Sequence, residues 1–201
     1  MRVIYAKYLS GEDIPVYDFA KKRKLVKYYT RETMAAIVAV SKLYEGLTVG
    51  QDMPFFYSTG EVEMLQFYKN IATQYATVQS EFSSLGFIEY ILPTISPLEQ
   101  FKMMRNMTAC FVSIENGLKG DNAVLLSSAS GLLYSALFAQ TDGPVLIGAG
   151  KQYADGTVEC GFAEIFRGEI ENHPMLNSSG DAITLFKNSP FIDHGDSNNR
   201  I

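Results

Sequence analysis

The hydrophobic and polar positions of the chain follow two different periods. Over residues 2–9 apolar and polar side chains alternate around β-branched and aromatic residues, which is typical of a half-buried strand. Over residues 23–47 apolar side chains recur every three or four positions as far as Gly46, and this pattern predicts one long helix. The apolar run 53–57, bounded by glycine and serine, predicts a buried strand.

Two further helices are predicted in the middle of the chain. Residues 61–82 begin with acidic side chains, which favour a helix N-terminus, and continue with an apolar stripe at helical spacing. After the serine and proline at 96–97, residues 98–121 predict a third helix, rich in methionine and closed by Gly117 and Gly120.

The remaining apolar segments are short. They predict strands at 123–126, 145–147 and 157–166 and a helix at 129–139. Strands that alternate with helices indicate a layered α/β fold.

Length and composition favour a single domain over the whole chain, 1–201. The 201 residues, 47% of them hydrophobic, are enough to bury one substantial core. We expect that core over about residues 1–166. The less apolar stretch of about 167–201, which ends in HGDSNNRI, is predicted to be a polar C-terminal extension.

The overall charge argues against two classes of partner. With 17 Lys and Arg against 22 Asp and Glu the net charge is -5, so the chain lacks the basic surplus that nucleic acids select for. No apolar run approaches the roughly 20 residues that span a bilayer, and the N-terminus turns polar too early for a signal peptide. We therefore expect no nucleic-acid partner, no membrane insertion and a cytoplasmic location.

Few residues are suited to metal binding or redox chemistry. Cys110 and Cys160 lack the spacing of a disulfide framework or a zinc site, so two reduced, mostly buried thiols are expected. His173 and His194 stand near no acid or nucleophile in any motif and are predicted to be solvated surface imidazoles. The glycines of 148–150 follow a strand without opening a helix, as a dinucleotide fingerprint would require. No metal or cofactor is expected.

The segment 126–131, LSSASG, is a candidate for a serine nucleophile. It lacks the first glycine of the Gly-x-Ser-x-Gly elbow, and a serine needs a nearby base. An independent acyl hydrolase or transferase that uses Ser128 or Ser130 remains an alternative.

Three consecutive motifs of the central segment resemble one family. Residues 117–122 read GLKGDN, residues 123–126 form an apolar strand, and residues 127–131 read SSASG. This succession is similar to the N-terminal half of β-ketoacyl synthases, where a Gly-Leu-x-Gly-Pro-Asn turn, an interface strand and an Ala-Cys-Ser-Ser-Gly turn follow one another. With weaker matches upstream and downstream, the resemblance spans about residues 23–165.

The resemblance implies a fold and a loss of activity. The fold would be a single half of the thiolase-like fold, a layered α-β-α arrangement around a mixed sheet. The nucleophilic cysteine is missing: Ala129 holds its position in an ungapped alignment, and Ser128 does so after a shift of one residue. Since a thiolate must take up the acyl chain, the chain most resembles a non-catalytic chain-length factor of the type II, aryl polyene kind.

Family membership would also imply partners. The chain would form a heterodimer with an active β-ketoacyl synthase, and an acyl carrier protein would reach it through that complex. The expected interface residues are Asn122, Ala123, Val124, Leu125 and Leu126.

The basic residues and the third helix have two interpretations each. Lys21, Lys22, Arg23 and Lys24, with Lys27 one turn later, are either a solvated helix start or a docking site for an acidic carrier protein. The expected tunnel-lining residues, three or four positions apart and so on one helical face, are Phe101, Met104, Arg105 and Thr108. The methionine and phenylalanine side chains could equally be ordinary core. A scaffold without acyl contact is the remaining alternative.

Overall fold

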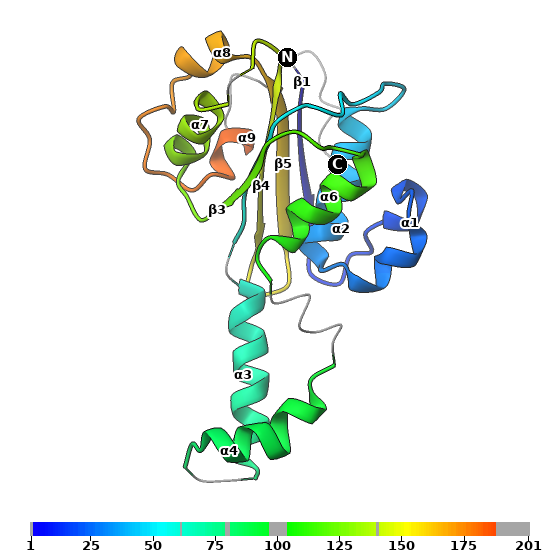
Figure 1. Ribbon diagram of the computed structural model, residues 1–201, viewed down its shortest axis with the longest axis vertical. Helices are drawn as coiled ribbons and strands as arrows, with labels where there is room; N and C mark the ends of the chain where they lie inside the picture. Colours follow the sequence, from blue (N-terminus) through cyan, green and yellow to red (C-terminus); the bar gives the residue numbers. More distant parts are fainter. Residues whose placement is uncertain (1, 61, 79–80, 97–103, 140, 188–201) are drawn as a thin grey trace.

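The chain folds around one mixed β-sheet. The computed structural model describes residues 2–60, 62–78, 81–96, 104–139 and 141–187. The strands are β1 (Arg2–Tyr8), β2 (Phe55–Ser58), β3 (Asn122–Leu125), β4 (Val145–Gln152) and β5 (Val158–Ile165). Their order in the sheet is β1-β5-β4-β2-β3, as Figure 1 shows. Strands β2, β3 and β4 are parallel to one another, and β5 is antiparallel to both of its neighbours.

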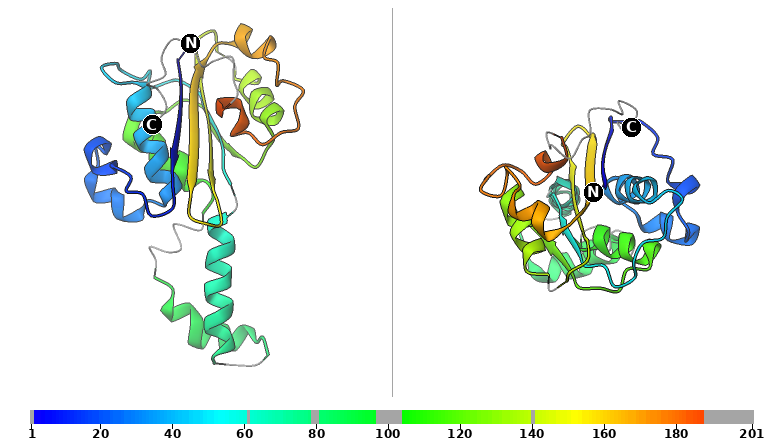
Figure 2. Two further views of the ribbon diagram at one scale, coloured as in Figure 1. Left: turned by 180° about the vertical axis from the view of Figure 1, so that it is seen from behind. Right: turned by 90° about the horizontal axis from the view of Figure 1, so that it is seen from above.

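Helices cover both faces of this sheet (Figures 1 and 2). On one side lie α1 (Val16–Phe19), the 3-10 helix η1 (Arg23–Tyr28), α2 (Arg31–Leu43) and α6 (Met107–Asn116). On the other side lie α7 (Ala129–Leu137), α8 (Arg167–Glu171) and α9 (Thr184–Lys187). The expected layered α/β architecture with a mixed sheet is confirmed.

The alternation of side chains along β2 explains the two layers. Phe55 and Tyr57 belong to the apolar cluster beneath α2 and α6, whereas Phe56 belongs to the cluster beneath α7. Successive side chains of a strand point to opposite faces, so a strand that is apolar at every position must be covered on both sides.

The predicted helix 23–47 is two helices. Tyr29 is extended between η1 and α2, and Thr30 caps α2 by accepting a hydrogen bond from the Thr33 backbone N–H at 3.0 Å. A threonine hydroxyl satisfies one of the amides that a helix start leaves unpaired, and this favours a new helix at residue 31 over continuation of the first.

The predicted third helix is shorter than its pattern. Helix α6 begins only at Met107, after a turn at 105–106, and residues 97–103 lie outside the described residues. Its end at Gly117 is as predicted: the φ of 69° there is a left-handed conformation that glycine adopts without strain.

A helical arm, defined here as the described residues between 62 and 94, projects from one end of the sheet (Figure 1). It contains α3 (Val62–Ala76), α4 (Ser84–Gly86), the π-helix η2 (Phe87–Ile91) and the 3-10 helix η3 (Leu92–Thr94). Tyr75 holds the arm together, because its hydroxyl accepts from the Ser83 N–H at 2.7 Å and lies 3.3 Å from the Glu81 carbonyl oxygen. Helix α3 ends at Ala76 and is therefore shorter than the predicted helix 61–82.

The core continues past the expected limit at residue 166. Ile170, Leu185 and Phe186 are fully buried, and the Phe186 ring lies over Gly161, where any larger side chain would collide with it. The fall in apolar content beyond residue 167 predicts a polar extension, yet α8 and α9 bury the apolar residues that this stretch contains. No helix in the described part of the chain has the length and apolar character to cross a membrane.

Candidate functional site

The turn between β3 and α7 is the place where the resembled family carries its nucleophile. Ser128 is the N-cap of α7, and its Oγ accepts from the Gly131 N–H at 3.3 Å. The same Oγ lies 2.9 Å from the Ser130 hydroxyl. Ala129, the first residue of the helix, is fully buried. Both candidate serines therefore have structural partners, and the alanine presents no chemistry.

Two backbone amides of this turn are already occupied. The Ala129 N–H donates to the Gly180 carbonyl at 2.7 Å, and the Ser130 N–H donates to the Ser178 carbonyl at 3.2 Å. Acyl transfer needs free amides or other donors aimed at the developing oxyanion. Here a segment of the chain itself, residues 178–181, takes up these donors.

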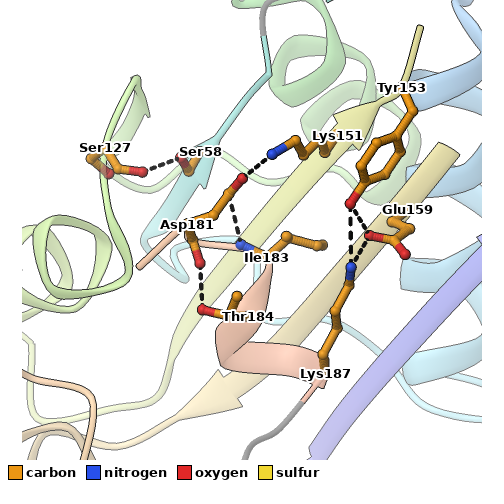
Figure 3. Close-up of polar contacts among 9 residues, drawn as sticks. All are labelled: Ser58, Ser127, Lys151, Tyr153, Glu159, Asp181, Ile183, Thr184 and Lys187. Carbon is orange, nitrogen blue, oxygen red and sulfur yellow. Dashed lines mark hydrogen bonds and ion pairs between the residues drawn. The ribbon is translucent and has the colours of Figure 1, made fainter. Parts of the chain in front are cut away.

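This covering segment (178–181) is fixed to the sheet through Asp181 (Figure 3). The Asp181 carboxylate pairs with Lys151 on β4 and also accepts from the Ile183 N–H at 3.3 Å. The pairing with Asp181 raises the pKa of Lys151. On the other side of the turn, the Ser58 hydroxyl donates to the Ser127 carbonyl at 3.2 Å. Sequence reasoning missed Asp181, which lies in the supposed polar extension, and no local motif marks it.

A buried carboxyl group lies at the end of β2. Glu32 Oε1 accepts from the Tyr57 hydroxyl at 2.7 Å and from the Thr59 hydroxyl at 3.1 Å. Burial raises the pKa of Glu32 to about 7, although both hydrogen bonds act in the opposite direction. Gly150 on β4 makes the arrangement possible, since a Cβ there would collide with the Tyr57 hydroxyl and the Glu32 carboxyl. The sequence shows Glu32 only as a polar residue in the first turn of a helix.

A second buried carboxylate ties α9 to the sheet. Glu159 on β5 is 3% exposed, accepts from the Tyr153 hydroxyl at 2.6 Å and pairs with Lys187 (Figure 3). Burial by itself would raise the pKa of Glu159, but the hydrogen bonds from Lys187, Tyr153 and Tyr5 outweigh it and lower that pKa. Burial and the same carboxylate raise the pKa of Tyr153 to about 12.

The thiols and the imidazoles lie away from the serine turn in the sequence. Both cysteines are free, as predicted, and Cys160 is fully buried on β5, where burial raises the pKa of its thiol. The expectation of a surface imidazole is wrong for His173. It is 5% exposed, burial lowers its pKa, and its Nδ1 accepts from the Met175 N–H at 3.2 Å. His194 lies outside the described residues, and no cluster suited to a metal ion occurs among those described.

Of the four expected tunnel-lining residues, the three that the structure describes do not share one helical face. Met104 and Arg105 precede α6, and Phe101 lies outside the described residues. Only Thr108 is in the helix, where its hydroxyl is buried 2.9 Å from that of Thr33 on α2. Met104 is 47% exposed. Whether these side chains line a tunnel stays a prediction.

The predicted interface strand is the last strand of the sheet. β3 pairs with β2 in the register Phe55 with Asn122 through Ser58 with Leu125, so Ala123 and Val124 face Phe56 and Tyr57. Its other edge has no strand partner among the described residues. Leu126, directly after β3, is 55% exposed.

The helical arm carries much of the exposed apolar surface. Seven of the sixteen large hydrophobic side chains that are exposed in the described chain belong to it. They are Tyr68, Val78, Phe82, Leu85, Ile88, Tyr90 and Leu92.

Fold and site together define a three-layer α/β domain in which residues 178–181 of the same chain cover the serine turn. Comparison with known proteins adds little to this. No family model matches the chain, and no curated protein matches it either. Among solved structures, a ketosynthase (ApeO) in complex with its chain length factor (ApeC) from Xenorhabdus doucetiae is similar at a TM-score of 0.37 and 11% identity. The match covers 75% of this chain and 60% of that one, and a superposition of this quality does not define a function.

Proposed function

We propose that this chain is a catalytically silent, ketosynthase-like subunit that pairs with an active β-ketoacyl synthase and shapes its acyl tunnel. The observation that carries the proposal is the serine turn. At the nucleophile position suggested by the motif resemblance stands the buried Ala129 or the helix-capping Ser128, and residues 178–181 occupy the neighbouring amides. An acyl-enzyme needs both a nucleophile and an oxyanion site, and the contacts of the Ser128 hydroxyl and of the Ala129 and Ser130 amides support a turn that supplies neither.

Pairing with a partner is supported by two surfaces. The outer edge of β3 has no strand partner among the described residues, and soluble proteins normally cover or protect such an edge. The helical arm adds exposed apolar side chains such as Phe82 and Leu85. In the proposed complex the ketosynthase covers β3 and the arm, a carrier protein delivers the acyl chain, and this chain contributes a wall of the tunnel.

The test is co-purification with a tagged ketosynthase from the same organism. Leu126→Glu places a charge beside the β3 edge at a side chain that is already exposed, so the fold should survive while the complex is lost. Leu9→Glu is the matched control, because Leu9 is 58% exposed and follows β1 at the opposite edge of the sheet. The proposal fails if the wild-type chain stays a monodisperse monomer beside the ketosynthase, or if both variants bind as the wild type does.

A further inference from the structure

We propose that Lys21, Lys22, Arg23, Lys24 and Lys27, called here the basic segment, form a docking surface for the acidic face of a folded partner protein, and that the buried Glu115 holds this surface in shape. All five side chains are exposed. None of them forms an ion pair with a carboxylate of the described residues, where the ion-paired cations are Arg2, Lys7, Lys151, Arg167 and Lys187.

Glu115 on α6 organises the backbone of the segment. Its carboxylate accepts from the Lys21 N–H at 2.7 Å and from the Lys22 N–H at 3.1 Å. It also accepts from the Tyr29 hydroxyl at 2.7 Å, and the Tyr29 ring lies 4.7 Å from that of Phe111. A carboxylate that is 5% exposed and bonded to two consecutive amides fixes the turn where η1 begins, and the cationic side chains stay outside it.

The packing of η1 determines which side chains of this stretch are buried and which are exposed. Val26 is buried and Leu25 is partly buried, so they anchor the 3-10 helix, while Arg23, Lys24 and Lys27 stay exposed. Because the backbone is already ordered, a partner has less conformational entropy to remove than it would from a loose basic loop.

The size of the patch and the acidic composition of the rest of the chain favour a compact acidic protein. The six residues of η1 span only about 12 Å at the rise of a 3-10 helix. Outside the basic segment the chain has 12 basic and 22 acidic residues. A long polyanion or a flat anionic membrane would extend beyond the patch and meet like charge, whereas a few carboxylates on one face of a helix would fit within it.

Binding is measured by fluorescence anisotropy with a labelled helical peptide that carries glutamates along one face. A DNA duplex and vesicles of phosphatidylcholine with phosphatidylserine serve as competing anions. We expect the peptide to bind, to bind more tightly than either competitor, and to weaken as salt rises. The double variant Lys22→Glu/Lys24→Glu should bind at least about tenfold more weakly. The control Lys69→Glu/Lys119→Glu makes the same change in net charge at exposed lysines elsewhere and should stay within about twofold of the wild type.

Two further variants test the role of Glu115 as a positioning residue. Glu115→Gln keeps the size of the side chain but weakens its hold on the two amides, so hydrogen exchange at Lys21 and Lys22 should quicken and the peptide should bind about threefold more weakly. Tyr29→Phe removes the hydrogen bond that the Tyr29 hydroxyl donates to the Glu115 carboxylate, and it leaves the Lys21 and Lys22 amides unchanged. It should lower the melting temperature and leave peptide affinity unchanged.

Three results would overturn the proposal: no peptide binding, tighter binding to DNA or vesicles, or equal losses in the two charge-reversal variants. Unchanged affinity in Glu115→Gln would overturn the positioning role. The assay contains no ketosynthase, so its outcome is independent of the proposed function.

Discussion

Replacing Glu32 by glutamine should make the protein more stable at neutral and alkaline pH. The carboxyl group is buried against the Tyr57 hydroxyl, and its ordinary pKa of 4.5 is raised to about 7 because burial disfavours the charged form. Glutamine keeps an oxygen that can accept from the Tyr57 and Thr59 hydroxyls, which donate to Glu32 in the wild type at 2.7 and 3.1 Å. The substitution therefore removes the ionisation and retains most of the contacts.

The size of the effect follows from the two pKa values. Below pH 4.5 the carboxyl is neutral in both states and costs nothing. Between pH 4.5 and 7 the unfolded chain ionises while the folded protein does not, so the free energy of unfolding falls with rising pH. At about 1.4 kcal/mol per pH unit the loss amounts to about 3 kcal/mol, and above pH 7 it stays constant because both states are ionised.

Urea unfolding followed by circular dichroism at pH 4.5, 6, 7 and 8 measures this difference. The advantage of Glu32→Gln over the wild type should grow by about 3 kcal/mol between pH 4.5 and 8. Glu45→Gln, which removes an exposed carboxylate just beyond the end of α2, is the control for a change of net charge. A constant difference across this range, or an equal gain in the control, would refute the reasoning.

Three other changes have defined outcomes. Glu159→Gln should destabilise the protein at a pH above the pKa of a glutamate in the unfolded chain, since the pKa of Glu159 is lowered in the folded state. This loss of stability should vanish as the pH falls through the folded pKa. Thermal melts at pH 7 and pH 3 measure the loss, and an equal loss at both would contradict the prediction. Ser128→Ala should cost about 1 kcal/mol of stability through loss of the helix cap but leave the output of the proposed heterodimer intact. Acylation of Ser128 by a reactive thioester, detected by mass spectrometry, would count against a silent subunit. If Met104 lines the proposed tunnel, Met104→Ala should lengthen the products of the proposed heterodimer with little effect on stability, because the side chain is 47% exposed. The product distribution and the amount of intact complex are measured together, and unchanged lengths in intact complex would exclude Met104 from the wall.

The sequence by itself determined the features that depend on neighbouring residues. Alternating side chains predicted β1, and an apolar run predicted β2. The glycine that ends α6 was recognisable because helices commonly end at a residue with left-handed backbone angles, which glycine adopts without strain. The absence of a thiol between residues 127 and 131 is likewise visible in the printed chain.

Only the tertiary structure decided what surrounds these elements. Asp181 reaches Lys151 across 30 positions, Glu115 reaches Lys21 across 94, and no local pattern encodes contacts of that range. The same holds for the covering segment 178–181, whose carbonyls occupy the amides of the serine turn. The apolar spacing extends N-terminal to Met107 and so predicts an earlier start than α6 has, and the burial of Phe186 depends on the space above Gly161, which no sequence pattern shows. The sequence pattern shows which residues prefer burial, whereas tertiary packing decides which residues they contact.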